Sequence, residues 1–467
     1  MDERGLESAL SKMQAAGLSD AARASFSRAW RQAASGAAGL IPEPEILPAD
    51  GVPDFSEVAA ADADPSLLGK LCVIKLNGGL GTSMGLEKAK SLIPVKDGLT
   101  FLDLIASQIV WLRNHHGTSG PRFLLMDSFS TSADTLAYMS RYPSLSPDGQ
   151  LDFLQNKIPK LCAHTLAPAE WPADPGLEWC PPGHGDLYPS LLGSGWLDRL
   201  EREGVEYLFV SNSDNLGATV DLGLLGYFAR SGLSFLMEVA SRTSSDRKGG
   251  HLTRRKSDGR LILREVAQCP PQDTASFQDI AKHRFFNTNT LWFRVGDLCA
   301  ALEKHGGALP LPLIKNTKTV DPRDSSSPPV LQLETAMGAA IECFEKSGAV
   351  LVPRTRFAPV KTTGDLLALR SDAYRLTDDF RLELSPECRG VPPEVVLDAG
   401  HYKVLSGLDR AFDRGAPSLR GCRRFEVTGP WKFGEAIVCQ GDVRFVNASP
   451  QIATARAGNY RDAVVNP

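Results

Sequence analysis

The sequence lacks the cysteine spacings and the long apolar runs that mark several classes of protein. Its nine cysteines are scattered and include no C-x-x-C pair, which disfavours a zinc ribbon or a dithiol redox centre. Odd, dispersed thiols are typical of a reducing compartment, so we expect free cysteines and a cytoplasmic location. No stretch approaches the roughly 20 apolar residues that cross a bilayer, and the first residues lack the apolar core of a secretory signal.

The sequence also lacks a large excess of positive or negative charge. The 467 residues contain 51 Lys plus Arg against 55 Asp plus Glu, a formal charge of −4. Because a nucleic-acid-binding domain is usually strongly basic, we expect no nucleic acid and no membrane as partners. The 42% apolar fraction is ordinary for a soluble protein, and the length suits two or three domains with large cores.

The first 40 residues are predicted to be helical. Ser19 or Asp20 is expected to cap the second helix. A helical pad on the main body is favoured over a regulatory element, and four prolines between 42 and 53 indicate an extended connector. Apolar side chains recur at the three- to four-residue spacing of a helix face: Leu6, Leu10 and Met13, then Ala22, Phe26 and Trp30.

Two changes in the sequence pattern divide the rest of the chain. From about Leu71, short apolar runs alternate with helical stretches, which predicts an α/β fold with a mostly parallel sheet between helices. After about residue 385, short β-prone pieces are separated by Gly, Pro and Asp, as in the coils of a parallel β-helix. An antiparallel barrel or sandwich is the alternative for that last region. The predicted strands of the α/β part are 71–76, 122–129, 206–217 and 233–240, with a helix over 101–114.

The sharpest motif is KLNGGLGTSMG, residues 75–85, directly after a predicted buried strand. Its glycines remove Cβ atoms where backbone can approach a ligand, and successive free N–H groups form a nest for phosphate oxygens. The spacing matches neither the Rossmann fingerprint nor a Walker A loop. A tight turn without a ligand is the alternative.

Two lysines follow segments that would direct their side chains towards phosphate groups. Lys90 lies a few residues past the glycine loop, where its ammonium group could neutralise a triphosphate. Lys361 follows the extended Phe-Ala-Pro-Val segment and is interpreted as a second phosphate-neutralising cation. A solvated helix lysine and a surface basic patch with Arg354 and Arg356 are the respective alternatives.

Three polar segments complete the candidate site. His184 stands between glycines in PPGHGDLY and could donate to a phosphate or a sugar hydroxyl, although a lone histidine is more often structural. In SNSDNLG, Asp214 among amides at a strand end suits Mg²⁺, or the segment is a capped turn. Asn287 and Asn289, two apart on one strand face, suit sugar hydroxyls but could equally close a turn.

In this order, these segments resemble the eukaryotic-type UTP–glucose-1-phosphate uridylyltransferase family, also called UDP-glucose pyrophosphorylases. The shared motifs run collinearly over roughly residues 70–370: KLNGGLGTSMG, KSLI, TFLDL, PPGHGD, VSN-x-DNLGATVD, KGG, FNTN-x-LW, QLETA-x-GAAI and VPR-x-RF-x-PVKTT-DLL. The resemblance implies a helical segment over 1–69, a Rossmann-like nucleotidyltransferase domain over 70–385 and a left-handed β-helix over 386–467. It also implies Mg²⁺ and the reaction of UTP with glucose 1-phosphate to give UDP-glucose and diphosphate.

The resemblance further implies individual roles. Lys361 and Lys90 would be the catalytic cations, Asp214 the metal ligand, and Gln155 the reader of the uracil edge. His184, Glu265, Asn287 and Asn289 would meet the sugar phosphate. The residues implied at the nucleotide are Leu76, Asn77, Gly78, Gly79, Lys90, Gln155, Gly183, Asn212, Ser213, Asp214 and Lys361.

Departures from the family pattern leave alternatives. The family's Met-Asn-Ser-Phe is MDSF here, with Asp127, and its Gly-Pro-Lys is KAK. The match in the C-terminal region is weak; the resemblance implies a homo-oligomer through that region for some relatives, with a monomer as the alternative. Broader UDP-sugar or UDP-N-acetylhexosamine pyrophosphorylases are the rival enzymes, and a catalytically inactive nucleotide-sugar sensor or scaffold is the rival of another class.

Overall fold

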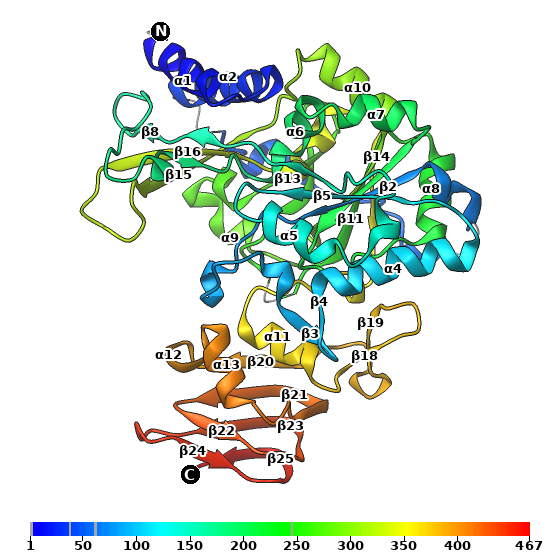
Figure 1. Ribbon diagram of the computed structural model, residues 1–467, viewed down its shortest axis with the longest axis vertical. Helices are drawn as coiled ribbons and strands as arrows, with labels where there is room; N and C mark the ends of the chain where they lie inside the picture. Colours follow the sequence, from blue (N-terminus) through cyan, green and yellow to red (C-terminus); the bar gives the residue numbers. More distant parts are fainter. Residues whose placement is uncertain (1–2, 37–38, 60–62, 244–245) are drawn as a thin grey trace.

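The computed structural model describes residues 3–36, 39–59, 63–243 and 246–467. A central sheet carries helices on both faces, two N-terminal helices lie at one end of the long axis, and a stack of short strands ends the chain at the other (Figure 1). In these described residues no helix is both long enough and apolar enough to cross a membrane.

One half of the central sheet is parallel, as the alternating strand and helix pattern predicts. Four strands lie in the order β6, β5, β2 and β10, all pointing the same way. Because their carboxyl ends meet at one edge, the segments that follow β2, β5 and β10 are brought together there. Their bounds are β2 Leu71–Leu76, β5 Arg122–Asp127, β6 Asp152–Leu154 and β10 Tyr207–Asn212.

The other half of the sheet is mainly antiparallel, which the prediction of a mostly parallel sheet missed. β14 (Phe285–Arg294) runs against both β10 and β11 (Phe235–Ser241). In the described residues between β11 and β14 the chain forms an antiparallel hairpin over 251–264 and one short α-helix, α9 (Thr274–Phe277), and not the helical crossover that usually joins parallel neighbours. The remaining strands are β1 Ile46–Pro48, β12 His251–Arg255, β13 Leu261–Arg264 and β17 Ser347–Leu351.

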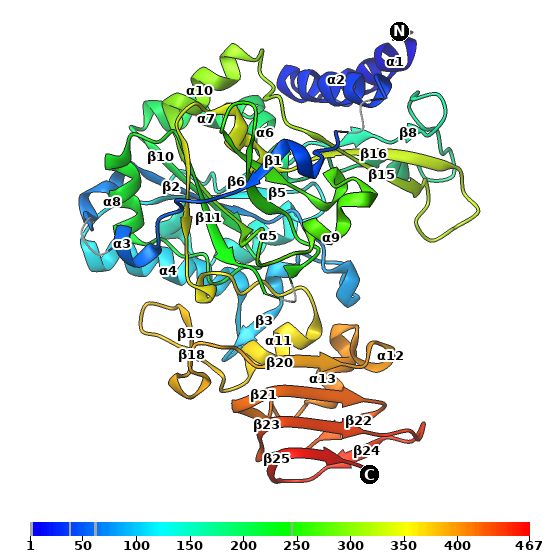
Figure 2. The ribbon, with the colours of Figure 1, turned by 180° about the vertical axis from the view of Figure 1, so that it is seen from behind.

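Strand alternation divides the core between the two faces of the sheet. On β2, Val73 packs into one cluster, with α4 (Phe101–His116) and α8 (Leu222–Ser231). Cys72 and Ile74 point into the other, beneath α6 (Leu187–Gly193), α7 (Trp196–Arg202) and α10 (Val295–Lys304). Figure 2 shows α6, α7 and α10 together on the side nearer the N-terminal helices. β2 is therefore apolar from Leu71 to Ile74, because both of its faces are covered there.

The two predicted N-terminal helices are confirmed as α1 (Arg4–Ala15) and α2 (Asp20–Ala34). Ser19 caps α2 by accepting a hydrogen bond from the Ala22 N–H at 3.2 Å. Their apolar faces pack, through residues such as Met13 and Trp30, on a small sheet of three strands. Those strands are β8 Leu161–Cys162, β15 Leu313–Thr319 and β16 Pro329–Thr335.

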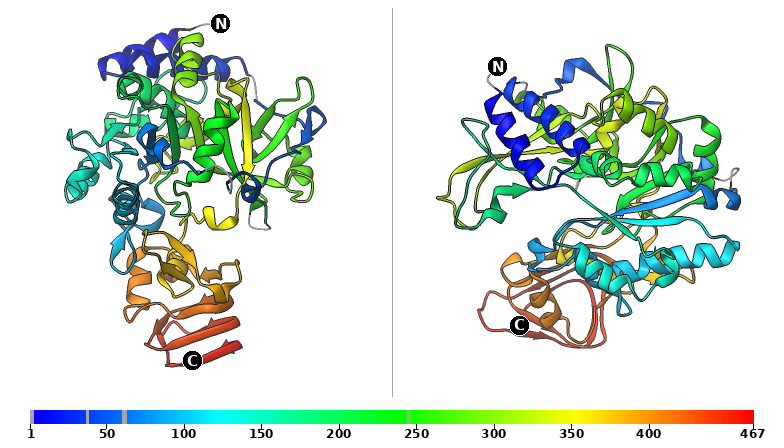
Figure 3. Two further views of the ribbon diagram at one scale, coloured as in Figure 1. Left: turned by 90° about the vertical axis from the view of Figure 1, so that its right-hand side faces the viewer. Right: turned by 45° about the horizontal axis from the view of Figure 1, so that its top comes forward.

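The C-terminal strands pair in parallel, so the antiparallel barrel or sandwich is wrong. β20, β21, β23 and β25 form one parallel sheet, and β22 pairs in parallel with β24. Figure 3 shows these strands stacked beneath the central sheet. Their bounds are β20 Glu394–Leu397, β21 Ser418–Thr428, β22 Trp431–Phe433, β23 Ile437–Val446, β24 Ala453–Ala455 and β25 Gly458–Val465.

Shorter elements join these parts. α3 (Phe55–Ala59) packs against α8, and α11 (Thr363–Arg370) packs against β20. The hairpin of β18 (Tyr374–Leu376) and β19 (Leu382–Leu384) lies between the central sheet and the C-terminal strands (Figure 1). The remaining elements are α5 Ser132–Met139, α12 Ala399–Tyr402, α13 Leu405–Ala411, β3 Pro94–Lys96, β4 Leu99–Thr100, β7 Ile158–Pro159 and β9 Trp179–Cys180.

Candidate active site

The glycine-rich loop leaves β2 at the carboxyl edge of the sheet and lies open to a cavity. A Cβ at Gly78 would come 2.7 Å from Gln155 Oε1, whereas one at Gly79 would meet no protein atom within 4 Å. Among the residues that the structure describes, no acceptor is paired with the N–H of Gly78 or Gly79. These two groups can therefore receive an anionic ligand. A 3₁₀ turn at Thr82–Met84 ends the loop, and the predicted helix over 101–114 is present as α4.

A cavity of about 320 Å³ brings together most of the residues that the sequence singled out. Its walls come from the ends of β2, β5 and β10, from Gln155 after β6, and from the segment 181–184. Met126 and Pro181 also line it, and the sequence reasoning gave neither of them a role. The lining is Leu76, Gly78, Gly79, Lys90, Met126, Gln155, Pro181, Gly183, His184, Asn212, Ser213 and Asp214.

Lys90 joins the glycine loop to the two other charged segments. Its backbone N–H donates to Gly79 O at 3.1 Å, which fixes it beside the loop. Its ammonium Nζ lies 2.7 Å from Asp214 Oδ2 and also donates to the Val360 carbonyl. The Val360 N–H in turn donates to Asp214 O at 3.1 Å. The residue immediately before Lys361 therefore contacts both members of the Lys90–Asp214 pair.

Lys361 lies on the far side of this junction. It is exposed and lines a second cavity, of about 490 Å³, together with Gly249 and Phe286. Its backbone N–H donates to Asp365 Oδ2 at 2.8 Å, in the capping box that starts α11. This cap holds the lysine in place at the helix start while its side chain stays free to reach a ligand.

Glu265 and the two asparagines gather beside that second cavity. A Cβ on Gly250 would come 2.4 Å from a Glu265 carboxylate oxygen, and Gly250 O accepts from the Asn287 N–H at 3.3 Å. Burial raises the pKa of Glu265, and the positive charge of Lys361 opposes that rise. Asn287 Nδ2 donates to Asn289 Oδ1 at 2.9 Å, so the two amides are adjacent.

The strand that carries the asparagines is irregular. Asn289 has φ +57°, in the left-handed region, and the pairing of β11 with β14 shifts at Glu238/Val239. The two side chains thus meet through a bulge in β14 and not through the regular alternation that the sequence predicted.

His184 is held as a neutral imidazole. Its Nδ1 accepts the Met337 N–H at 3.0 Å, and burial lowers its pKa to about 4. The proton therefore resides on Nε2, which leaves that nitrogen as a hydrogen-bond donor. His184 lines the cavity of the glycine loop, so it lies with the nucleotide candidates.

Gln155 and Gly183 face each other across the same cavity. Gln155 Nε2 donates to Gly183 O at 3.3 Å, and the Gln155 N–H donates to Asp127 O at 2.6 Å. Gly183 has φ +79°, and a Cβ there would lie 2.6 Å from Thr335 O. Glycine is thus required at 183 by both its conformation and its neighbour.

Asn77 points away from the cavity, unlike the glycines that follow it. Its side chain is 2% exposed, and Nδ2 donates to Asp127 Oδ1 at 2.7 Å and to Thr135 Oγ1 at 3.0 Å. Asp127 is fully buried, and Oδ2 has no partner among the described residues. Burial raises the pKa of this carboxyl to about 7.

Two residues near Lys361 have structural contacts that the sequence reasoning missed. Arg356 is buried in a bidentate ion pair with Glu238, at 2.7 and 2.8 Å, so it is not part of a surface basic patch. Asn215 donates to Arg356 O at 3.2 Å and accepts the Ala358 N–H at 2.9 Å. Asn215 thereby fastens the Asp214 loop to the segment that leads to Lys361.

The donor set at Asp214 fits Mg²⁺. Its carboxylate is 24% exposed and opens on the cavity of the glycine loop, and Mg²⁺ is usually held by one or two carboxylates together with phosphate oxygens. Within the described residues no cluster of three or more His, Cys, Asp or Glu side chains could hold a metal by itself. A metal here would therefore depend on a phosphate ligand.

A glycine loop with free N–H groups at the carboxyl edge of a parallel sheet, with two lysines and a carboxylate near it, is typical of an α/β nucleotide-binding protein. The family profile described as UTP–glucose-1-phosphate uridylyltransferase matches residues 24–440. The chain belongs to this family.

Known relatives and solved structures agree with that membership. A UTP–glucose-1-phosphate uridylyltransferase from Solanum tuberosum is 42% identical over 396 residues, 83% of this chain and 80% of its own. One from Saccharomyces cerevisiae is 40% identical over 398 residues, 85% and 78% of the two chains. A Leishmania major UDP-glucose pyrophosphorylase variant, solved in complex with UDP-glucose, superposes with a TM-score of 0.93 at 46% identity, covering 99% of both chains.

Proposed function

We propose that the chain catalyses the reaction of UTP with α-D-glucose 1-phosphate to give UDP-glucose and diphosphate. The observation that carries the proposal is the junction at Val360, where the segments of Lys90, Asp214 and Lys361 meet beside the glycine loop. Two anions must be brought together for this reaction, and that junction gathers the cationic groups able to compensate their repulsion.

The reaction is an in-line displacement. An oxygen of the sugar phosphate forms a bond to the α-phosphorus of UTP, and the bond from that phosphorus to the diphosphate oxygen breaks. The sugar phosphate is already ionised at neutral pH, so no general base and no covalent enzyme intermediate are required. The enzyme's contribution is positioning and charge compensation by Lys90, Lys361 and the N–H groups of Gly78 and Gly79.

The two cavities suggest how the substrates divide. UTP would lie in the cavity of the glycine loop, with its phosphates on Leu76–Gly79 and Lys90, its ribose beside Asn212 and Ser213, and its uracil edge between Gln155 and Gly183. The glucose ring would lie near Glu265, Asn287 and Asn289. His184 Nε2–H, within the first cavity, is a donor for a phosphate oxygen where the two substrates meet.

Asp214 would hold Mg²⁺ when the nucleotide is bound, and the ion would supply positive charge to the phosphate oxygens. In this structure the carboxylate is paired with Lys90 at 2.7 Å. Binding of the metal and phosphates would therefore break the ion pair between Lys90 and Asp214, and the Lys90 ammonium group would then contact a phosphate oxygen.

The test is a matrix of nucleoside triphosphates against sugar 1-phosphates, with and without Mg²⁺, read by diphosphate release. We expect turnover with UTP and glucose 1-phosphate in the presence of Mg²⁺, and little with galactose or N-acetylglucosamine 1-phosphate. Preferred use of N-acetylglucosamine 1-phosphate would favour the rival enzyme class. Tight UDP-glucose binding without turnover of any pair would favour a sensor.

We propose in addition a three-part chain of residues 1–69, 70–385 and 386–467, with the last part a left-handed β-helix. Paired positions such as Phe425, Val443 and Ala463 are roughly 18–20 residues apart, which suits a coil of three hexapeptides. An experimental structure with a right-handed or open coil would contradict the β-helix. The nine free cysteines favour a reducing, cytoplasmic location.

The possible homo-oligomer would use the last strand of the parallel sheet. β25 is an edge strand, and Val464 on it is 63% exposed. Sedimentation velocity of the wild type and of Val464→Lys tests this surface. A larger species that only the wild type forms would support it, and a monomer in both would exclude it.

A further inference from the structure

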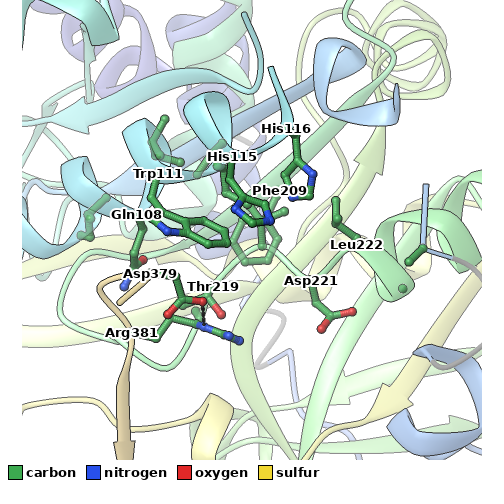
Figure 4. A pocket seen from close by; sticks show the side chains of 18 of the residues that line it. Gln108, Trp111, His115, His116, Phe209, Thr219, Asp221, Leu222, Asp379 and Arg381 are labelled. Atoms are coloured by element: carbon green, nitrogen blue, oxygen red, sulfur yellow. Dashed lines mark ion pairs between the residues drawn. The ribbon is translucent and has the colours of Figure 1, made fainter. Parts of the chain in front are cut away.

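A third cavity lies away from the nucleotide edge, beneath α4 and α8. Its volume of about 630 Å³ is within the range of sites for small organic ligands. The walls come from α3, α4, β2, β10, the start of α8 and the turn between β18 and β19. Figure 4 shows this cavity from close by.

Aromatic rings form one side of it. The Trp111 and His115 rings of α4 stack at 4.3 Å between centroids, with only 12° between their planes (Figure 4), and Phe209 of β10 also lines the cavity. Ile105 and Ile109 continue this apolar wall along α4. Flat ring surfaces of this kind are complementary to a flat ring system.

The charged groups around the cavity already have partners. Arg381 is 2.6 Å from Asp379, and Asp221 caps α8 by accepting the Leu224 N–H at 2.9 Å. Lys75 Nζ donates to Ser211 Oγ at 2.7 Å and to Ala218 O at 2.6 Å. Burial also lowers the pKa of Lys75 to about 7. An ionic ligand would have to displace one of these pairs, whereas an uncharged one would not.

The cavity wall is tied to both segments of the nucleotide site. Lys75 precedes the glycine loop, and its two hydrogen bonds reach the strand and the loop on either side of Asp214. Thr219 lines the cavity, and its carbonyl accepts from Arg356 Nη2 at 2.9 Å. Arg356 lies in the segment that leads to Lys361. A ligand that displaces residues 218–220 would therefore also displace the backbone next to Asp214 and the segment that leads to Lys361.

From these contacts we infer that the cavity binds an uncharged, planar, fused-ring aromatic compound, and that its occupation lowers turnover at the nucleotide site. The binding site stands on the cavity alone, and the effect on turnover rests on the proposed function.

The probe is prodan, an uncharged naphthalene fluorophore whose emission shifts to shorter wavelength in apolar surroundings. We expect saturable binding to the full chain at a single site. Trp111→Ala should weaken it at least about tenfold, because the stacking face is lost. Leu112→Trp, which fills part of the cavity with a larger side chain, should also weaken prodan binding. Trp171→Ala, the same change at a half-buried tryptophan outside the cavity, should leave it unchanged.

Diphosphate release at saturating prodan supplies the second measurement. We expect kcat to fall at least about fivefold in the wild type and in Trp171→Ala, but not in Trp111→Ala. Equal prodan binding by the wild type, Trp111→Ala and Leu112→Trp, or no binding to any of them, would overturn the site. Trp111-dependent binding without a change in kcat would overturn the coupling. Trp111-dependent binding to a chain with no diphosphate release would leave the site standing and contradict the proposed function.

Discussion

Replacement of Asp127 by asparagine should remove a pH dependence of stability that this buried carboxyl causes. Asp127 is fully buried, and its pKa is raised from 3.8 to about 7, chiefly by burial. Between these two values the folded chain binds a proton that the unfolded chain has released. The free energy of unfolding should therefore fall as pH rises from about 4 to about 7.

The size of the effect follows from the shift. Roughly three pKa units correspond to about 4 kcal/mol, of which about 2.5 kcal/mol accumulates between pH 5 and pH 8. In Asp127→Asn the Asn77 amide can still donate to the new side-chain oxygen, so any loss of packing is the same at every pH. The free energy of unfolding of Asp127→Asn, relative to that of the wild type, should thus rise by about 2–3 kcal/mol from pH 5 to pH 8.

Urea unfolding at pH 5, 6, 7 and 8 measures this difference directly. Asp378→Asn, at an exposed aspartate, is the matched control, and its offset from the wild type should stay constant. Parallel pH curves for the wild type and Asp127→Asn would refute the reasoning, because they would mean that Asp127 does not hold its proton in the folded chain.

Three further substitutions test the site. Lys361→Ala should lower kcat by about 100-fold or more while the KM for glucose 1-phosphate changes little, because the cation acts on charge that develops during phosphoryl transfer. Glu238→Gln should lower the free energy of unfolding by about 3–5 kcal/mol, measured by urea unfolding, because Arg356 would keep a buried unpaired charge. Gly78→Ala should raise the KM for UTP at least about tenfold, since its Cβ would come 2.7 Å from Gln155 Oε1 and displace the loop or the glutamine.

Matched controls for these three lie on the surface helix α10. Lys304→Ala, Glu303→Gln and Gly296→Ala make the same chemical changes at exposed or open positions and should behave as the wild type. A kcat for Lys361→Ala equal to that of Lys304→Ala would remove Lys361 from the chemistry. A loss below about 1 kcal/mol for Glu238→Gln would mean that Arg356 is solvated. Unchanged UTP affinity in Gly78→Ala would mean that the loop does not meet the nucleotide.

Much of the site could be predicted because local patterns place residues at strand ends. The predicted strands 71–76 and 206–217 become parallel neighbours over 71–76 and 207–212, so the glycine loop and Asp214, each just past its strand, meet at one edge. Lys90 could be placed from its distance to that loop. The family resemblance implied that Lys90 and Lys361 act on one nucleotide. The contact of Lys90 with Val360 was not predicted, because no local pattern relates positions so far apart in the chain.

What the sequence did not predict depends on the direction of single side chains and on long-range pairing. Asn77 turns inward because Asp127 and Thr135 accept its amide hydrogens, and both lie on other elements. Arg356 was grouped with surface charges because its partner, Glu238, lies on a distant strand. The bulge at Asn289 depends on the pairing of β14 with β11, which a parallel sheet would not contain.

The central claim is that the ammonium groups of Lys90 and Lys361 act on one nucleotide tail. The most direct test is a crystal structure with Mg²⁺, glucose 1-phosphate and a UTP analogue whose α,β-bridging oxygen is replaced by an imido group. The account predicts both Nζ atoms within about 3.5 Å of phosphate oxygens around the α-phosphorus. A complex in which only Lys90 contacts the phosphates, while the Lys361 ammonium group lies away from them, would contradict it.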